Sequence, residues 1–333
     1  EGIGMVIFDE YHERSIHADV AMALSRETQS ILRPDLRILI MSATLNMPEL
    51  VNLLQAPLVE SKGRQYPVET IYMDLSDEYM MAETAATTVI RALKEKKGDV
   101  LVFLPGQREI SKCAEIINRQ TTDIAIHELY GKLPFSKQQA AIYPNKTGKR
   151  KVVIATDIAE TSLTIEGVTI VVDSGFGRTS QFDPKTGLSG LKTIHISKDS
   201  ADQRSGRAGR LGPGTCYRMW SKGKHSQLNE HRVPEIMEAD LAPLVLDMAN
   251  WGITDPNQLT WLSPPPNHSL QQANDILHSL NALEKGRVTS HGKEMQKLIS
   301  GTFSLLMTQL LGPLPYFWTP GVSSFSEVLT LSN

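Results

Sequence analysis

Near its beginning the chain passes from a short apolar run directly into charged residues, in the order Met5-Val6-Ile7-Phe8-Asp9-Glu10-Tyr11-His12. The apolar run is typical of a strand buried in a parallel sheet. A carboxylate at the carboxyl end of such a strand lies at the sheet edge where ligands bind. Asp9 is therefore suited to holding Mg²⁺ on nucleotide phosphates, and Glu10 to polarising an attacking water as a general base. An isolated Asp-Glu pair, however, is more often an acidic loop in solvent.

Outward from this segment, strand patterns alternate with helical patterns in two series, the rhythm of parallel α/β sheets. The first series has strands at 5–8 and 37–41 with a helix near 20–32 between them. The second has helices near 83–96, 109–119 and 136–143 and strands near 100–104, 124–129, 152–155 and 168–173. The acidic, irregular stretch 67–78 is the expected linker, with the domain boundary near Asp77. After Trp220 the strand patterns stop, and helices are expected at 234–251 and 269–283.

Composition narrows the class of protein. The 333 residues correspond to two or three domains at roughly 100–200 residues each. A formal net charge of −3 excludes a histone-like polycation but leaves room for local basic clefts. Only Cys113 and Cys216 are present, which fits a reducing compartment and favours the cytosol. No apolar run reaches the roughly 18 residues of a membrane span.

Two hydroxyl-bearing segments also follow apolar strands. Ser42-Ala43-Thr44 comes directly after the second strand, where small hydroxyl residues can relay hydrogen bonds from a nucleotide site to a moving neighbour. Thr156, Thr161 and Ser162 follow the strand near 152–155 and can donate to a nucleic-acid phosphate. Helix capping is the ordinary alternative for both segments.

The segment 203–210 combines arginines with small residues: Gln203-Arg204-Ser205-Gly206-Arg207-Ala208-Gly209-Arg210. Arg207 and Arg210 share one face of a helix, and the small residues let that face approach another domain closely. An arginine supplied across a cleft to a γ-phosphoryl group accelerates its transfer by about 10³–10⁵. A solvated basic helix is the alternative, although two glycines disfavour a helix.

In this order, the four segments resemble motifs II, III, V and VI of superfamily 2 helicases of the DEAH-box group. Residues 101–106 match motif IV, and 182–188 resemble the segment leading into the β-hairpin of these enzymes. Within the group the chain is most similar to the bacterial HrpB-type ATP-dependent RNA helicases, on the evidence of residues 9–15, 63–68, 239–244 and 280–283. The resemblance extends from Glu1 to about residue 298.

The resemblance implies a fold and a set of domains. It predicts an α/β protein with tandem RecA-like parallel-sheet domains, the first partial, followed by a mostly helical winged-helix and helicase-associated region. The expected bounds are 1–77 for the first RecA-like domain with the DEAH box and the Ser-Ala-Thr motif, 78–222 for the second, 223–298 for the helical region, and 299–333 for an unassigned tail. The tail has Glu327 as its only charge, and Pro and Gly interrupt every periodic pattern in it.

The resemblance also assigns a nucleotide site, with ATP and Mg²⁺ as cofactors. Asp9 would coordinate the metal, Glu10 would activate water, and His12 would link the nucleotide to the RNA-binding cleft. The other residues expected at or coupled to this site are Ser42, Thr44, Gln203, Gly206, Arg207 and Arg210. Arg210 is the best candidate for the arginine finger.

Nucleic acid is the implied partner, with RNA expected and DNA left open. Thr156 and Thr161 would contact the backbone rather than the bases. No membrane association is implied, and protein partners stay unassigned.

The sequence departs from the family in three respects. Tyr11 replaces the Ala of the name motif, a change that should spare the neighbouring carboxylates. Asp157 stands where relatives often carry Asn, and a carboxylate beside a phosphate path is unfavourable unless it is paired. The chain contains no Gly-x-x-x-x-Gly-Lys-Ser/Thr loop, so we expect an incomplete copy that is inactive alone.

Two other classes of function stay open. A non-catalytic nucleic-acid-binding module with a RecA-like fold would explain the missing loop, but Glu10, Gln203, Arg207 and Arg210 favour hydrolysis. A helicase-like nuclease subunit has less support, because no carboxylate cluster beyond Asp9-Glu10 could hold its metal.

Overall fold

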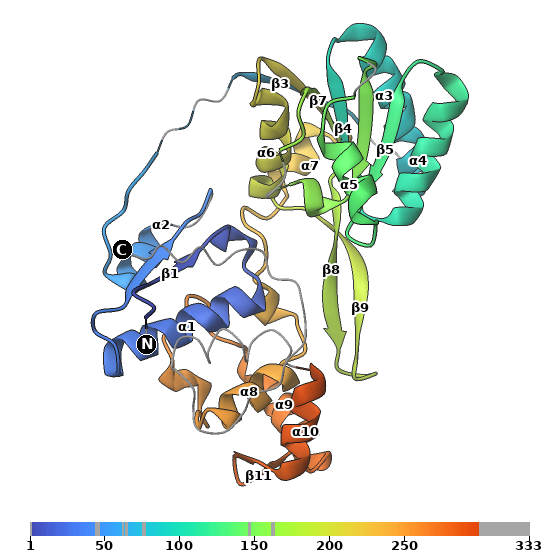
Figure 1. The fold of residues 1–333 in the computed structure, drawn as a ribbon. Helices are drawn as coiled ribbons and strands as arrows, with labels where there is room; N and C mark the ends of the chain where they lie inside the picture. Colours follow the sequence, from blue (N-terminus) through green and yellow to red (C-terminus); the bar gives the residue numbers. More distant parts are fainter. Residues whose placement is uncertain are drawn as a thin grey trace. The chain divides into compact units, whose positions relative to one another are not determined.

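The computed structural model describes residues 2–43, 47–61, 63, 66–74, 78–145, 148–160 and 164–299. The chain forms two compact units. Unit 1 comprises Glu1–Leu58, Ser180–Gly190 and Val233–Asn333, and unit 2 comprises Val59–Thr179 and Leu191–Arg232. Figure 1 shows the elements of each unit along the chain.

A six-stranded sheet lies at the centre of unit 2, in the order β3-β10-β7-β4-β6-β5. Every neighbouring pair is parallel. The strands are β3 (Val68–Tyr72), β10 (Gly214–Arg218), β7 (Val168–Asp173), β4 (Asp99–Phe103), β6 (Lys151–Ala155) and β5 (Ala125–Leu129). The central strands are apolar on both faces because helices cover both sides of the sheet.

Alternate residues of one strand belong to two different cores. Val100 and Val102 of β4 pack in the core that includes α3 (Met81–Glu95) and α4 (Gln107–Gln120). Leu101 and Phe103 point to the opposite face, towards α5 (Phe135–Ile142) and the turn that follows α6 (Lys198–Gly206). This separation follows from the two-residue period of a strand. A short helix, α7 (Lys222–Ser226), follows β10.

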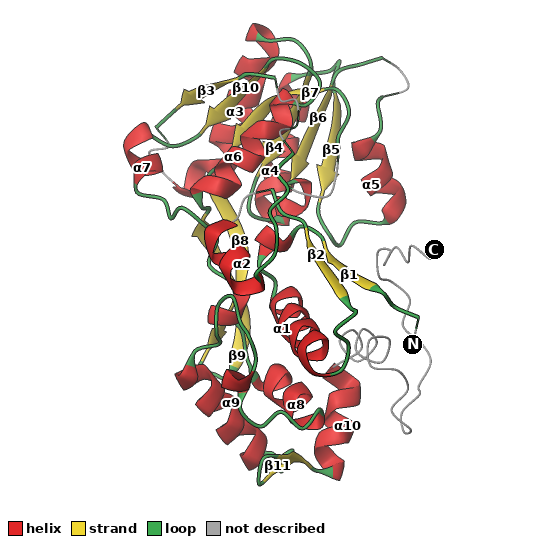
Figure 2. Ribbon diagram, turned by 90° about the vertical axis from the view of Figure 1, so that its left-hand side faces the viewer, coloured by secondary structure: helices red, strands yellow, loops and turns green. Residues whose placement is uncertain are grey.

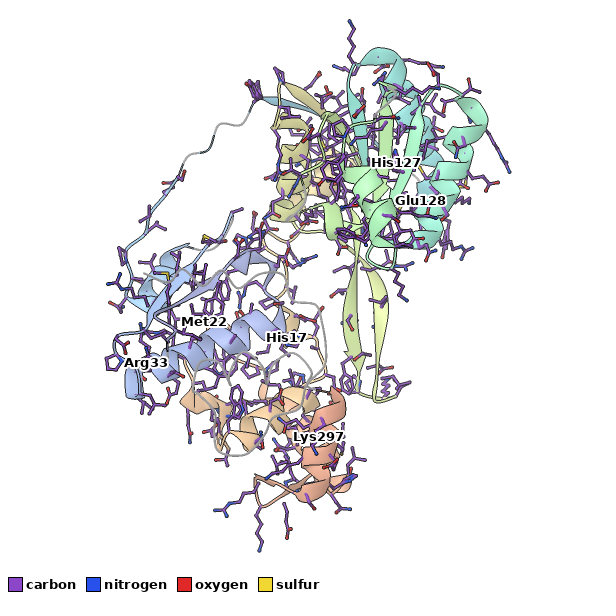
Figure 3. All side chains as sticks on the ribbon, in the orientation of Figure 1. His17, Met22, Arg33, His127, Glu128 and Lys297 are labelled. Carbon is purple, nitrogen blue, oxygen red and sulfur yellow. The ribbon has the colours of Figure 1, made fainter. Side chains whose placement is uncertain are left out.

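Unit 1 joins the beginning of the chain to its later helices around one core. Strands β1 (Met5–Phe8) and β2 (Arg37–Ile40) pair in parallel, with Phe8 opposite Ile40. The helices are α1 (Ile16–Ile31), α2 (Met47–Leu54), α8 (Ala242–Asn250), α9 (Asn267–Ser279) and α10 (Ser290–Ile299). Met22 of α1, labelled in Figure 3, is fully buried in the same cluster as Leu246 of α8 and Leu277 of α9. A small antiparallel pair, β11 (Leu283–Glu284) and β12 (Arg287–Val288), lies between α9 and α10.

A long hairpin is formed by β8 (Phe176–Asp183) and β9 (Leu188–His195) (Figure 2). The segment 182–188, which resembles the segment leading into the family hairpin, lies at its tip. The Asp183 carbonyl accepts hydrogen bonds from the N–H groups of Thr186 and Gly187. Gly187 has φ +69°, a left-handed conformation that favours glycine. In unit 1, the Phe182 N–H donates to the Glu238 carbonyl at 3.0 Å.

The α/β fold with a parallel sheet is confirmed, but the expected linker is wrong. Residues 68–72 form β3, which pairs with β10 along its whole length. The change from unit 1 to unit 2 therefore precedes β3, at Leu58 and Val59, rather than lying near Asp77, which is outside the described residues. Strands also continue after Trp220 as β11 and β12, so the later region is not wholly helical. The tail after residue 299 lies outside the described residues.

Cys113 and Cys216 are buried free thiols, and burial raises the pKa of each to about 12. Among the described residues, no helix has the length and apolar character needed to cross a membrane.

Candidate nucleotide and nucleic-acid sites

Strand pairing brings the acidic motif and the Ser-Ala-Thr motif to the same edge of the β1–β2 sheet. Beyond the last paired residues, the Met41 N–H donates to the Phe8 carbonyl at 2.7 Å, and the Tyr11 N–H donates to the Met41 carbonyl at 3.1 Å. Both motifs therefore begin where these two strands end, as the sequence predicted.

The two carboxylates of the acidic motif point differently. The Glu10 N–H donates to Asp9 Oδ1 at 2.8 Å. Glu10 itself has φ +51°, a conformation uncommon for a side chain of this size. Asp9 is exposed and Glu10 partly buried. This difference is compatible with the separate roles that the sequence predicts, metal binding for Asp9 and water activation for Glu10.

His12 connects the two motifs. The Ala43 N–H donates to His12 Nδ1 at 3.3 Å, so the ring proton belongs on Nε2. His12 Nε2 lies 3.5 Å from Glu10 Oε2. A shift of the segment 42–43 would therefore reach Glu10 through one buried ring. The Ser42 side chain has no hydrogen-bond partner among the described residues, and Thr44 lies outside them.

In unit 2, Arg204 is the centre of a buried ionic network. Its Nε lies 2.9 Å from Glu160 Oε2, and its Nη1 lies 3.0 Å from Asp173 Oδ1. Burial lowers the pKa of Arg204, but the two carboxylates outweigh burial and the net direction is upward. Burial also raises the pKa of Asp173, opposed by Arg204. Arg204 therefore fixes α6 to the end of β7 and to the segment that follows β6.

Arg207 and Arg210 both contact this same segment after β6. The Arg207 guanidinium donates to the Glu160 carbonyl, and Arg210 Nη1 donates to Thr164 Oγ1 at 2.6 Å. The two arginines are three positions apart, but α6 ends at Gly206 and Arg207 begins a 3-10 turn (Arg207–Gly209). The expectation that Arg207 and Arg210 lie on one helix is therefore wrong. Arg207 is buried and Arg210 exposed.

The small residues of this segment have a role inside unit 2. A Cβ on Gly209 would lie 2.6 Å from the Tyr66 carbonyl oxygen, and the Tyr66 N–H donates to the Gly209 carbonyl at 2.9 Å. Gly209 therefore allows the chain entering β3 to pass against the turn. Gln203 and Gly206, on the last turns of α6, are partly buried.

Thr156 begins the turn that follows β6. Its N–H donates to the Leu129 carbonyl at 3.1 Å, and its Oγ1 accepts from the Ile158 N–H at 3.5 Å. The Thr156 hydroxyl therefore caps the turn, as the alternative interpretation of this segment predicts. A capping hydroxyl still has a lone pair and a proton available for a further contact. Asp157 lies 3.8 Å from Arg232, which supplies the partner that a carboxylate here requires. Thr161 lies outside the described residues.

Comparison with known proteins agrees with this arrangement. Residues 83–212 match the helicase conserved C-terminal domain. The chain is 43% identical over 299 residues to the ATP-dependent RNA helicase HrpB of Escherichia coli, covering 89% of this chain and 37% of HrpB. It is 38% identical over 298 residues to the ATP-dependent RNA helicase HrpA of Borreliella burgdorferi, covering 87% of this chain and 36% of that protein. Over most of its length the chain is similar to ATP-dependent RNA helicases of the HrpB and HrpA type.

Solved structures give the same result. A crystal structure of the E. coli DEAH/RHA helicase HrpB matches 94% of this chain and 40% of its own chain, at 41% identity and a TM-score of 0.85. A second, described as the DExH-box NTPase HrpB, matches with a TM-score of 0.83. The chain thus spans about two fifths of the DEAH-box relatives it matches.

Sequence reasoning missed the residues that hold the DEAH-box motifs in place. Glu160, Asp173 and Arg204 are not among the site residues that the sequence predicts. Lys151 was also missed: its buried Nζ donates to the carbonyls of Ala141, Ile142 and Tyr143 at the end of α5. A detectable signal existed only for Glu160, a charged residue between the small and hydroxyl residues that follow β6.

Proposed function

We propose that this chain is part of an ATP-dependent RNA helicase that couples ATP hydrolysis to movement along RNA. HrpB, HrpA and the splicing factor prp22 of Schizosaccharomyces pombe, to which the chain is 38% identical, are all named as ATP-dependent RNA helicases. The chain spans 37% of HrpB and 26% of prp22. The helicase activity is therefore proposed for a larger protein of which this chain is a part.

The main support for this proposal is the hydrogen bond that the Ala43 N–H donates to His12 Nδ1. Through this bond the His12 imidazole lies between Glu10, the proposed water-activating carboxylate, and the Ser-Ala-Thr segment that we propose responds to RNA. A solvated acidic loop would not need a buried histidine that faces both motifs. This linkage is what coupling between hydrolysis and movement requires.

The nucleotide roles follow from position and chemistry. Asp9 would hold Mg²⁺ bound to ATP, since its exposed carboxylate supplies the oxygen ligands that Mg²⁺ prefers. The described residues contain no cluster of three metal-ligating side chains, which fits a metal carried largely by phosphates. Bound Mg²⁺ would neutralise charge on the phosphates. The γ-phosphate would be faced by Gln203, Gly206, Arg207 and Arg210, with Arg210 as the finger.

The RNA roles rest on the residues after β6. Thr156 and Thr161 would donate to backbone phosphates, so binding should depend weakly on base sequence. DNA remains an alternative substrate. The cytoplasm is the proposed location, in keeping with two buried free thiols.

The test is RNA-stimulated phosphate release from a chimera in which the upstream segment of E. coli HrpB, with its phosphate-binding loop, is fused to this chain. Glu10→Gln keeps the shape of the side chain and removes its basicity. We expect turnover in the parent chimera and its loss in the variant. RNA binding without turnover in either protein would favour the non-catalytic binding module instead.

A further inference from the structure

A cavity of about 290 Å³ in unit 2 lies at the carboxyl edge of the sheet. Its lining comes from the residues that follow three neighbouring strands: Asp74 after β3, Ser174 to Phe176 after β7, and Trp220 after β10. Ligands of open parallel sheets bind outside this edge. Thr156 follows β6 at the same edge, whereas none of the nucleotide residues assigned above lines the cavity.

Aromatic rings form two parts of the cavity wall. Phe176 and His195 lie with ring centroids 4.3 Å apart, at 33° between their planes. Trp220 is held in position on its other sides: its ring stacks at 28° on His225, and the Arg218 guanidinium lies 5.7 Å from its centroid. A Cβ on Gly175 would lie 2.7 Å from Trp220 Cε3, and Gly175 has φ +81°, so glycine is needed here for the ring to fit. The Trp220 ring is therefore fixed by packing before any ligand arrives.

The polar groups of the cavity are suited to a base with its attached phosphate. Trp220 is 7% exposed, and its Nε1–H is buried with no hydrogen-bond partner among the described residues. A buried donor without a partner is unfavourable, so an acceptor entering the cavity would relieve that cost. Lys224 and Asp74 are exposed at the cavity, one suited to a phosphate and the other to an exocyclic amino group.

We propose that this cavity takes an unpaired nucleobase of single-stranded RNA, between the Phe176–His195 pair and Trp220. The proposal rests on the RNA binding proposed above and adds to it a contact with a base, where Thr156 would contact only the backbone. Planar rings, a buried donor and a lysine at the rim together match a stacked nucleotide. A side chain of a protein partner has no phosphate for Lys224 to bind, so RNA is the better match for the cavity.

Photo-crosslinking of the full chain tests the proposal. Short single-stranded RNAs that carry 5-iodouridine are irradiated with the protein, and the adduct is located by peptide mass spectrometry. We expect an adduct on Trp220, His195 or Phe176. Binding of RNA should also weaken by about tenfold when abasic nucleotides replace the bases, since stacking is then lost.

Variants separate the cavity from the rest of the surface. Trp220→Leu should reduce RNA affinity by about tenfold, while Trp220→Phe keeps a smaller aromatic ring for stacking and removes the donor. Lys224→Ala, at an exposed position, should weaken binding without affecting folding. Phe135→Ala removes an exposed aromatic ring on α5 and serves as the matched control, with no loss expected.

Two outcomes would overturn the inference. One is RNA binding that is equal for intact and abasic strands. The other is adducts found only outside the cavity. Absence of any RNA binding would instead contradict the proposed function itself, so the two failures are distinguishable.

Discussion

Arg204 and Asp173 form an ion pair closed off from solvent, with Nη1 3.0 Å from Oδ1 and both side chains at most 1% exposed. Glu160, on the opposite side of the guanidinium, completes the network. A guanidinium between two buried carboxylates can satisfy both because its donors point in fixed directions. This pair joins the strand end, the residues after β6 and the helix that leads to Arg207 and Arg210.

Replacing Arg204 should therefore act on stability before it acts on catalysis. Arg204→Ala leaves two buried carboxylates without their cation, and we expect unit 2 to lose about 3–5 kcal/mol of unfolding free energy. Urea unfolding followed by circular dichroism measures this. Arg91→Ala removes an exposed pair with Glu95, which solvent screens, and should cost much less. Equal losses in the two variants would show that the buried network does not stabilise the unit.

The sequence predicted the central strands and missed the polar ones, for a physical reason. Residues 100–103 are apolar on both faces because both faces are covered, so their pattern is strong. β3 carries Glu69 and Thr70 and pairs on one side only, so the same stretch resembled a linker. β9 is exposed along its whole length and has no burial pattern to detect.

The motif residues of the candidate site could be predicted from the sequence, but the residues that hold those motifs in place could not. Asp9 and Thr156 were located because they directly follow apolar strands. The contacts of Arg204 join positions 31 and 44 residues away, and no local pattern records such pairs. The break between α6 and the 3-10 turn was missed for a related reason: Gly209 is required by the chain entering β3.

Acid should destabilise unit 2 through His127, which lies on β5 (Figure 3). Burial lowers the pKa of His127, and Lys151 lowers it further, while Asp99 opposes both. The folded-state pKa then lies below the unfolded value of about 6.5, so the unfolded chain binds more protons as the pH falls through that value. The free energy of unfolding should therefore be highest above about pH 7 and should decrease below it until the pH has passed the folded-state pKa.

Urea midpoints at about pH 7.5 and 5.5 measure this decrease on either side of the unfolded pKa. His127→Gln should show a smaller difference between the two midpoints than the parent. His17→Gln, at an exposed position on α1, should keep the parental difference. A His127 variant as sensitive to acid as the parent would rule out this residue as a source of the effect.

Arg210→Ala should lower ATP turnover in the HrpB chimera by about 10³-fold or more, since a finger acts on charge that develops in the transition state. Nucleotide affinity, measured with a fluorescent ATP analogue, should fall much less. Thr164→Ala is the matched control, because it removes the partner of Arg210 at 2.6 Å and keeps the guanidinium. Unchanged turnover in the Arg210 variant would exclude it as the finger.

Thr156→Ala should weaken the binding of unrelated RNA sequences by similar factors, because a hydroxyl on a phosphate reads no base. Fluorescence anisotropy with several labelled RNAs at two salt concentrations measures this, and affinity should fall with salt as counterions are released. Thr156→Ser keeps the hydroxyl that caps the turn and should bind like the parent. A loss confined to one RNA sequence would mean that Thr156 contacts a base.

The 333-residue chain alone should not hydrolyse ATP, although it carries Asp9, Glu10 and Arg210. Phosphoryl transfer depends on positioning, and the β- and γ-phosphates need a loop of backbone N–H groups with its Lys and hydroxyl. No such loop occurs in the sequence, so an intact water-activating carboxylate should give little acceleration. Phosphate release with saturating RNA, measured beside the HrpB chimera, is the test. Comparable turnover in the two proteins would mean that residues within this chain hold the phosphates by themselves.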